Sequence, residues 1–478
     1  MKKLVKIYQS FLYFLPAILF FSYQPVISLG ATASMNLELS LPLIWLVLFD
    51  ILSLILLLKL SKNLKKVFKG ITDRKFFLLS LFPFYSTLSI FWSPNPLRAI
   101  LTAGILWALF FAIFSILYLY QNLPDLKKDF KTQLLRSILI STVIVSVWCW
   151  FQCVLDLLDF DQSTTLLCDG CTYEMFGFPH PNGFAIEPQF MGNLLLAPTI
   201  LTLHLYLKSN QKNRTYLALL IFLSATLFLT FSRGAIYSFV LAVIAMLVMF
   251  VVKTKTARPL FSVIPLAIAF IFTLNAQGIM TQTSPTNDTY LTGITKSIDQ
   301  LTLGIFNLST SNNSAPEATT PDETNTLSSD SEEASTTSAE NSEPESAVFD
   351  GYVEVSTEVR LTLTSQAITV WSSSLKTIFF GVGLGGAGTA LYEAGYSVSP
   401  KEIIQNQYAS LLLETGLIGI ATLLLAIILT IKMLRRSQKL ALYIPLAIAY
   451  ATSLLFFAGL PNALHIYLMP PLISKTKK

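Results

Sequence analysis

Long apolar runs recur along almost the whole chain and are separated by short polar segments. Each run is close to the roughly 20 residues that a helix needs to cross about 30 Å of hydrocarbon. The runs are continuous, whereas the strands of a membrane barrel alternate apolar and polar positions. The pattern therefore predicts an all-α polytopic membrane protein with about 12 transmembrane helices, at residues 10–29, 41–60, 76–93, 98–119, 135–157, 184–207, 215–231, 235–252, 259–276, 408–431, 440–459 and 461–474.

The composition indicates the same class of protein. The chain has 478 residues, of which 53% are hydrophobic and 13% are charged, whereas a soluble protein has roughly a quarter charged residues. The opening MKKLVKIYQSFLYFLPAILFF has the charge and the apolar run of a secretory signal, but no small-residue cleavage site follows directly. We interpret it as a retained first span.

The positions of Lys and Arg predict the orientation. They collect in MKKLVK, SKNLKKVFKGITDRK, LKKDFKTQLLR, KSNQKNR, KTKTAR, KMLRRSQK and SKTKK. These clusters all fall on one side if the spans alternate, and basic loops face the cytoplasm. The sequence therefore predicts that both termini are cytoplasmic.

The longest outward segment, 277–407, separates a bundle of about nine helices at 1–276 from the last helices at 408–478. It carries a net charge of −12, against +17 for the rest of the chain. Residues 309–346 are rich in Ser, Thr and acidic residues and poor in apolar ones, which predicts a disordered tether. Apolar residues return at 348–407, where we expect helices lying over the membrane face.

Two pairs of cysteines differ in their surroundings. Cys149 and Cys153 lie within an apolar run and are expected to be core residues. Cys168 and Cys171, in the outward loop LLCDGCTY, fit a small disulfide, a redox pair or half of a metal site. A zinc site needs two further ligands that the sequence does not supply, so we expect no metal.

Arg233 stands in FLTFSRGAIYSF, at the outer turn between two predicted spans. One interpretation is that its side chain reaches lipid phosphate at the interface. The other is an anion site, because a guanidinium binds phosphate oxygens two at a time. Gly234 beside it allows a close approach of backbone or ligand.

Further polar residues gather at the outer end of the sixth span, in GFPHPNGFAIEPQFMGNLL. They are His180, Asn182, Glu187 and Gln189. Glu187 lies about one turn into the apolar region, where ionisable groups are costly and usually functional. This position makes Glu187 a candidate functional residue.

The outward segment adds a second arginine and a glycine-rich stretch. Arg360 precedes LTLTSQAITVW, and FFGVGLGGAG follows. No strand-turn-helix unit surrounds these glycines, so they are not a dinucleotide fingerprint. We interpret them as a tight turn in which Gly383 contacts a ligand. QNQYASLLLETGLIG then opens the tenth span and places Glu414 about two turns into it.

These motifs together resemble the O-antigen ligase and O-antigen polymerase superfamily. The resemblance rests on SRGA at the outer end of a span, GVGLG after an Arg-bearing outer helix, and NxY…LLxETGLIG opening the next span. HPNGFA is similar to the PN-containing turn of the family, and FWSPNP to its early outer loop. The resemblance covers roughly residues 75–460 in order and topology.

The resemblance implies a GT-C type membrane glycosyltransferase of the bacterial cytoplasmic membrane. Such an enzyme transfers or polymerises a glycan from an undecaprenyl-diphosphate carrier at the outer face. The acceptor is a glycan, a lipid or a protein, and no nucleotide sugar, metal, other cofactor or nucleic acid takes part. Arg233 and Arg360 match the two outward arginines of the family and are expected to hold the diphosphate, whose departure needs preorganised positive charge.

The sequence departs from the family pattern at Gln405. The family commonly reads HNxY there, with a His that is proposed to activate the acceptor hydroxyl, whereas this chain reads QNQY. Gln orients a hydroxyl by hydrogen bonding but is no base. Either His180, Glu187 or Glu414 takes the proton, or stabilisation of the leaving group supplies most of the catalysis, or the activity is altered or lost. The change slightly favours a polymerase over a ligase.

The neighbours of Gln405 complete the predicted site. Asn406 and Tyr408 are expected to support the loop, with Tyr408 contacting sugar. Asn182, Gln405, Asn406, Tyr408, Glu414 and Gly383 are thus the predicted substrate contacts, and Arg233, Arg360, His180 and Glu187 the predicted catalytic residues.

Two other functions stay open at this point. A transporter or flippase of a lipid-linked saccharide would keep polar groups at the bilayer midplane and often shows duplicated halves. Asp50 is the one deep ionisable residue far from the outer face, and no repeat appears. A catalytically inactive membrane scaffold is the other alternative.

Overall fold

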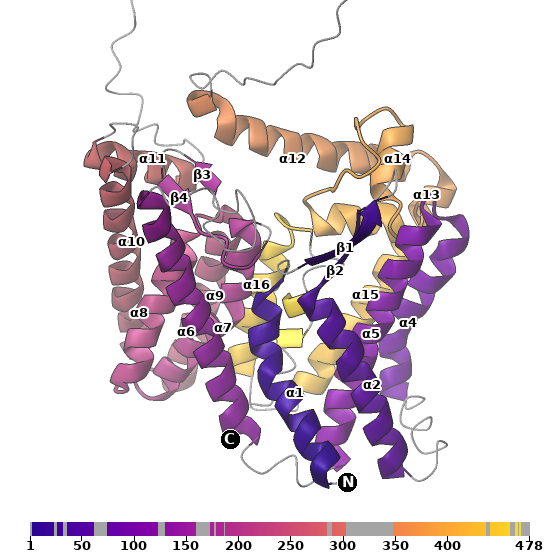
Figure 1. Ribbon diagram of the computed structural model, residues 1–478, viewed down its shortest axis with the longest axis horizontal. Coiled ribbons are helices and arrows are strands. Elements are labelled where there is room, and N and C mark those ends of the chain that lie inside the picture. The colour runs from indigo at the N-terminus through magenta and orange to yellow at the C-terminus, as the bar shows by residue number, and fades with distance from the viewer. Residues whose placement is uncertain are drawn as a thin grey trace, which may run out of the picture.

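The computed structural model describes most of the chain as helices arranged side by side (Figure 1). The described residues are 2–22, 26–31, 36–61, 74–122, 130–158, 173–175, 178–185, 187–283, 289–302, 348–435, 440–458, 464–466 and 468–469. Cys168, Cys171, the predicted tether at 309–346 and most of the predicted last span lie outside them.

Eight helices in the described part of the chain are long and apolar enough to cross a membrane, and three shorter ones are also apolar. The protein is therefore an all-α polytopic membrane protein, as predicted from the hydrophobic pattern. The count of twelve crossings stays a prediction. The helices of the bundle are α1 (Lys2–Phe20), α2 (Leu41–Ser61), α4 (Arg74–Leu88, followed by η1, Ser89–Trp92), α5 (Pro96–Asn122), α6 (Phe130–Leu157), α7 (Pro188–Lys208), α8 (Arg214–Leu229), α9 (Arg233–Thr254), α10 (Val263–Thr283, after η3, Arg258–Ser262), α15 (Gln407–Arg435) and α16 (Leu440–Ser453).

The first span differs from the prediction. The helix runs over Lys2–Phe20, and strand β1 (Val26–Ala31) pairs antiparallel with β2 (Asn36–Ser40) where the prediction continued the helix to residue 29. The segment VISLGA is rich in β-branched and apolar residues, which suit a strand as well as a span. Helix and hairpin cannot be separated by hydropathy alone in such a run.

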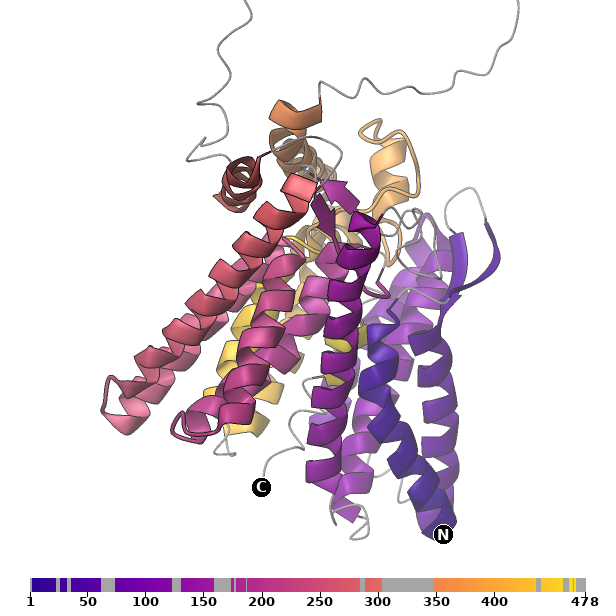
Figure 2. The ribbon, with the colours of Figure 1, turned by 60° about the vertical axis from the view of Figure 1, so that its left-hand side comes forward.

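Four further helices lie at one end of the bundle, opposite the start of α1 (Figures 1 and 2). They are α11 (Tyr290–Thr302), α12 (Val348–Ser372), α13 (Leu375–Phe380) and α14 (Ala387–Glu393). In Figure 1, α12 crosses over the ends of the spans instead of continuing any of them. Two-stranded β3 (Tyr173–Met175) and β4 (Phe178–His180) lie at the same end.

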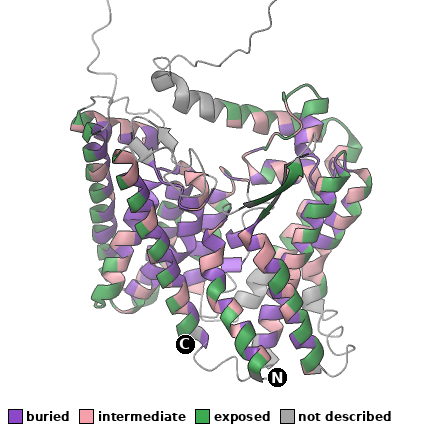
Figure 3. Ribbon diagram, viewed as in Figure 1, coloured by how far each residue is buried: buried purple, intermediate pink, exposed green. Residues whose placement is uncertain are grey.

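Helix α7 is the central helix of the bundle. Its span is 89% buried, whereas no other candidate span exceeds 50%. It contacts α8, α9 and α16, and Figure 3 shows the buried residues concentrated in this region. Cys149 and Cys153 of α6 are buried in the same core, as expected, and are not joined in a disulfide. The first residues of α7 therefore stand in the middle of the end that carries α11 to α14.

Candidate functional site

The starts of α7 and α9 pack closely against each other. A Cβ at Gly192 of α7 would lie 2.8 Å from the Cβ of Ala235 and 3.0 Å from that of Ser232. Only a residue without a side chain permits this approach. The contact brings the residue that precedes α7, Glu187, to the region where α9 begins with Arg233.

Arg233 is the first residue of α9 and is half-buried. The Ser232 side chain caps the helix by accepting the N–H of Ala235 at 3.4 Å. The guanidinium interacts electrostatically with Tyr237, one turn on, and the Tyr237 hydroxyl donates to the Leu301 carbonyl of α11. Tyr237 thereby connects Arg233 to α11, one of the helices at the outer end of the bundle.

Arg360 reaches the start of α7 from α12. Glu187 precedes α7 in extended conformation, and its side chain caps no helix N–H. Burial raises the pKa of the Glu187 carboxyl above its usual value, and the nearby Arg360 guanidinium partly offsets that rise in pKa. Two pairs, Glu187 with Arg360 and Arg233 with Tyr237, thus lie at the starts of the adjacent helices α7 and α9. We call these four residues the arginine site.

His180 and Asn182 lie in the segment that leads to Glu187 and α7. His180 is 2% exposed, and its ring meets Phe231 edge-on with centroids 5.4 Å apart. Asn182 is fully buried, and its side-chain oxygen accepts from Gln152 of α6 at 3.1 Å. Gln152 also accepts the N–H of Gly183 at 2.9 Å. The amide oxygen of Asn182 thus holds the turn to α6, and its predicted substrate contact stays a prediction.

The residues around Gln405 are fastened to the end of α16. The Asn406 side chain caps α15 by accepting the N–H groups of Tyr408 and Ala409 at 3.1 and 3.2 Å. The Tyr408 hydroxyl donates to Ala451 at 2.7 Å. Asn406 and Tyr408 therefore support this loop through specific hydrogen bonds. Gln405 differs, because no described residue hydrogen-bonds to its buried Oε1.

The same end of α16 touches the arginine site. The Gln189 side chain of α7 donates to the Phe456 carbonyl, and a Cβ at Gly234 would lie 2.8 Å from the Cβ of Phe456. The segment after α16 is thus a shared neighbour of Arg233 and of the residues that open α15. The tertiary structure brings the two predicted parts of the site to one place.

The glycines of GVGLGGAG bind protein backbone. The Val382 N–H donates to Leu413 at 2.8 Å, and the Gly383 N–H donates to the Glu414 carbonyl at 2.9 Å. Three segments, Ser89–Arg98, Gly381–Gly388 and Leu413–Gly416, meet here, and we call them together the glycine lock.

Contacts with backbone explain why these positions are glycine. Gly381 has φ +75°, and a Cβ there would lie 2.4 Å from the Glu414 carbonyl carbon. Gly416 has φ +59°, and a Cβ there would lie 2.5 Å from the Phe379 oxygen. A Cβ on Gly383 would meet the Cα of Ser93 at 2.5 Å. The side of Gly383 where a side chain would stand is filled by Ser93, and its predicted ligand contact stays a prediction.

Side chains of the early outer loop complete the lock. Ser89 accepts the N–H of Leu384 at 3.1 Å, and Ser93 donates to the Leu384 carbonyl at 3.0 Å. The Tyr85 hydroxyl lies within hydrogen-bond distance of the carbonyls of Phe380 and Thr415, at 3.0 and 2.9 Å. The motif FWSPNP therefore contacts GVGLG directly through Ser93, and Tyr85 of α4 contacts ETG.

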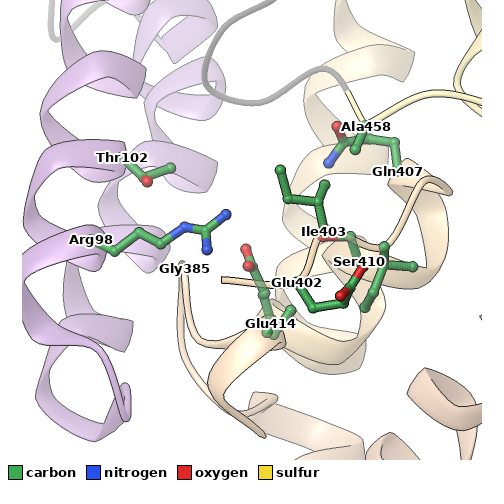
Figure 4. A pocket seen from close by; sticks show the side chains of 12 residues that line it. Arg98, Thr102, Gly385, Glu402, Ile403, Gln407, Ser410, Glu414 and Ala458 are labelled. Carbon is green, nitrogen blue, oxygen red and sulfur yellow. The ribbon is translucent and has the colours of Figure 1, made fainter. Parts of the chain in front are cut away.

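Glu414 belongs to the lock as well. Its carboxylate accepts the N–H groups of Gly385 and Ala387 and interacts with the Arg98 guanidinium, and Figure 4 shows the two charged side chains pointing toward each other. A cavity with about 440 Å³ of unfilled space, its open mouth included, lies between α5 and α15 at this point. Glu414 thus holds the loop, and its predicted part in proton transfer or substrate contact stays a prediction.

Sequence reasoning missed Arg98 and Tyr85. Arg98 follows FWSPNP by two residues and sits in the first turn of α5, where its N–H donates to the Asn95 side chain at 3.2 Å. Only the spatial meeting of α5 with α15 shows its partner. As for metals, the described residues contain no group of three or more His, Cys, Asp or Glu that could hold an ion.

The comparison with protein families covers this region. Residues 218–424 match the family model described as O-antigen ligase. This segment of the chain is similar to the O-antigen ligase family. The match starts in α8, ends in α15 and includes Arg233, Arg360 and the glycines at 381–388. It confirms the resemblance inferred from the motifs. No curated protein matches the chain.

The match indicates the general class of function. It supports a glycosyltransferase-like membrane protein of surface-polysaccharide assembly, with a lipid-linked glycan and an acceptor as substrates in general terms. Its many apolar helices and its family fit a protein of the bacterial inner membrane.

Proposed function

We propose that this protein transfers or polymerises a glycan from an undecaprenyl-diphosphate carrier at the outer face of the cytoplasmic membrane. The observation that carries the proposal is the arginine site, in which Arg360 lies against Glu187 at the start of α7 while Arg233 opens the adjacent α9. Both arginines fall within the segment matched by the O-antigen ligase family.

The two arginines take the part of diphosphate ligands. Negative charge builds up on the diphosphate as the sugar leaves, and guanidinium groups placed beforehand stabilise that charge. The N-termini of α7 and α9 add partial positive charge at the same place. The basic loops predicted to be cytoplasmic put these residues on the outer side, with both termini inside.

Glu187 takes the part of proton acceptor. Burial raises the pKa of its carboxyl toward the working pH of an enzyme, which favours general-base catalysis. Gln405, whose Oε1 has no described partner, accepts a hydrogen bond from the acceptor hydroxyl and orients it. The buried His180 and the engaged Glu414 are less suited to the proton transfer.

The test uses purified full-length protein in lipid nanodiscs, with lipid-linked glycans extracted from cells that lack the protein. Wild-type protein should lengthen the glycan or move it to an added acceptor. Arg233→Ala and Arg360→Ala should each lower the rate by about 100- to 1000-fold, as when an oxyanion ligand is removed. Lys376→Ala is the matched control, because Lys376 is an exposed cation on the same outer layer.

Two measurements separate the proposal from its alternatives. Undecaprenyl diphosphate should raise the melting temperature of wild-type protein and have a smaller effect on Arg233→Ala. Normal transfer in both arginine variants would refute the arginine mechanism. Lipid-linked glycan that crosses the bilayer without any transfer would indicate a flippase, and binding without transfer or crossing would indicate a scaffold.

A further inference from the structure

Arg98 is a charged residue that the proposed transfer reaction does not use. Asn95 caps α5 through its side chain, which accepts the Arg98 N–H at 3.2 Å. The guanidinium then extends from the first turn of α5 across the cavity toward Glu414 of α15 (Figure 4). α5 and α15 are separated by more than 280 residues of sequence, so this pairing exists only in the folded protein.

Glu414 is engaged on every side that the structure describes for it. The N–H groups of Gly385 and Ala387 donate to its carboxylate, and Arg98 supplies the positive charge. Charge-assisted hydrogen bonds of this kind are about twice as strong as neutral ones. Removing Arg98 would leave a carboxylate in a largely closed place with two amide donors and no cation, which is unfavourable.

The residues of α15 that precede Glu414 pack against α12 through apolar side chains. Leu413 and Ala409 of α15 form one buried cluster with Ala367 of α12 and Leu391 of α14. Leu363 and Trp371 of α12 pack against it. Because packed interiors are dense and resist small displacements, a shift of the first turns of α15 is passed on to α12.

Arg360 lies on α12, seven residues before Ala367. Seven residues are about two turns, so Arg360 projects from nearly the same face of the helix as Ala367. Contacts therefore lead from Arg98 through Glu414 and Leu413 to Ala367, and the rigid helix α12 connects Ala367 to Arg360.

We propose that Arg98 is a positioning residue, which through Glu414 and the cluster shared by α15 and α12 places the Arg360 guanidinium against Glu187. The inference rests on the proposed glycosyl transfer, because Arg360 is the residue whose work depends on that placement. Arg98 itself touches neither the glycan nor the lipid diphosphate.

The kinetic test compares Arg98→Gln, Glu414→Gln and the double variant, with the same lipid-linked glycans in nanodiscs. Each single change should lower kcat and kcat/KM together by about 100-fold, as expected for loss of alignment in the transition state. The double variant should be no slower than the slower single variant, because both changes remove one interaction. Arg98→Lys keeps the positive charge, so its kcat/KM should be only about tenfold lower than that of wild type. Lys376→Gln should behave as wild type.

A second readout does not depend on activity. Hydrogen exchange of the amides of Gly385 and Ala387, followed on peptides over 381–391, should become faster in Arg98→Gln and in Glu414→Gln. Hydrogen exchange should also become faster in peptides of α12 around Arg360, whereas exchange in peptides of α9 should keep its wild-type rate. If Arg98→Gln does not fold, Arg98→Lys is used for the same measurement, since a single ammonium replaces the guanidinium fork less well.

The outcomes separate this inference from the proposed function. If wild-type protein transfers glycan and Arg98→Gln does so equally fast, with unchanged exchange, the positioning role is overturned while the proposed function stands. Losses in the two single variants that multiply in the double variant would also overturn it. If wild-type protein transfers no glycan under any condition, the proposed function fails, and faster exchange in both peptides would still support the link from Arg98 to α12.

Discussion

The arginine site and the glycine lock lie at the same end of the molecule, and both contain motifs of the O-antigen ligase family. In the lock, backbone and side-chain groups bind one another, and the glycines are required by contacts with neighbouring backbone. In the arginine site, two guanidinium groups and a carboxyl of raised pKa are half-buried. The lock builds structure, and in the proposed function the arginine site holds the charged groups that bind the substrate. Motifs of one family therefore serve two different physical purposes, and the following experiments test that division.

The largest effect is expected from Gly381→Ala. The new Cβ would lie 2.4 Å from backbone of Glu414, at φ +75°, and we expect a loss of about 3–5 kcal/mol in the free energy of unfolding. Gly395→Ala is the matched control, because Gly395 has the same φ and nothing within 4 Å, and it should lose only about 1 kcal/mol. Thermal unfolding in detergent measures both. Equal losses would show that contact with α15 is not what requires glycine at 381.

The next effect concerns the pH dependence of transfer. A general base works when it is ionised, so activity should be present above the raised pKa of Glu187 and lost as the pH falls through it. Glu187→Gln should lower the rate by about 100-fold and remove this acid limb. Rates between acid and neutral pH, with the exposed Glu393→Gln as control, check the expectation. An acid limb that persists in Glu187→Gln would assign the proton to another group.

A smaller effect is expected from Gln405→Ala. Its side-chain oxygen has no described partner, so truncation should cost one neutral hydrogen bond to the acceptor, about tenfold in kcat/KM, and leave the melting temperature unchanged. Initial rates at varied acceptor concentration measure it. A drop in melting temperature with unchanged kinetics would place Gln405 with the supporting residues.

The smallest effect is expected from Tyr408→Phe. The hydroxyl donates to Ala451 at 2.7 Å, so its removal should cost about 1 kcal/mol of stability and leave the transfer rate close to that of wild type. Unfolding and transfer assays on the same preparation decide. A large loss of transfer rate without a loss of stability would indicate that Tyr408 contacts sugar.

Much of the organisation could be predicted from the sequence. Continuous apolar runs specify membrane helices because the hydrocarbon thickness sets their length, and the described helices follow most of the predicted ranges. The family was recognisable because its motifs occur in a fixed order along the chain. Arg233 and Glu187 were singled out because charged groups near apolar segments are costly and therefore informative, and Arg360 because it matches an outward arginine of the family; their part in catalysis stays a prediction.

The partners of these residues were decided only by the tertiary structure. Asn182 and Gly383 look like ligand contacts in sequence, because a polar or a glycine residue in an outer turn suits either a substrate or a neighbouring backbone. Which of the two it meets depends on α6 and on Ser93, far away in the chain. The pairing of Arg98 with Glu414 has the same cause, since helix packing and not local sequence brings α5 to α15. Periodicity and cost of burial act locally and can be read along the chain, whereas complementarity between distant elements exists only once the helices are packed.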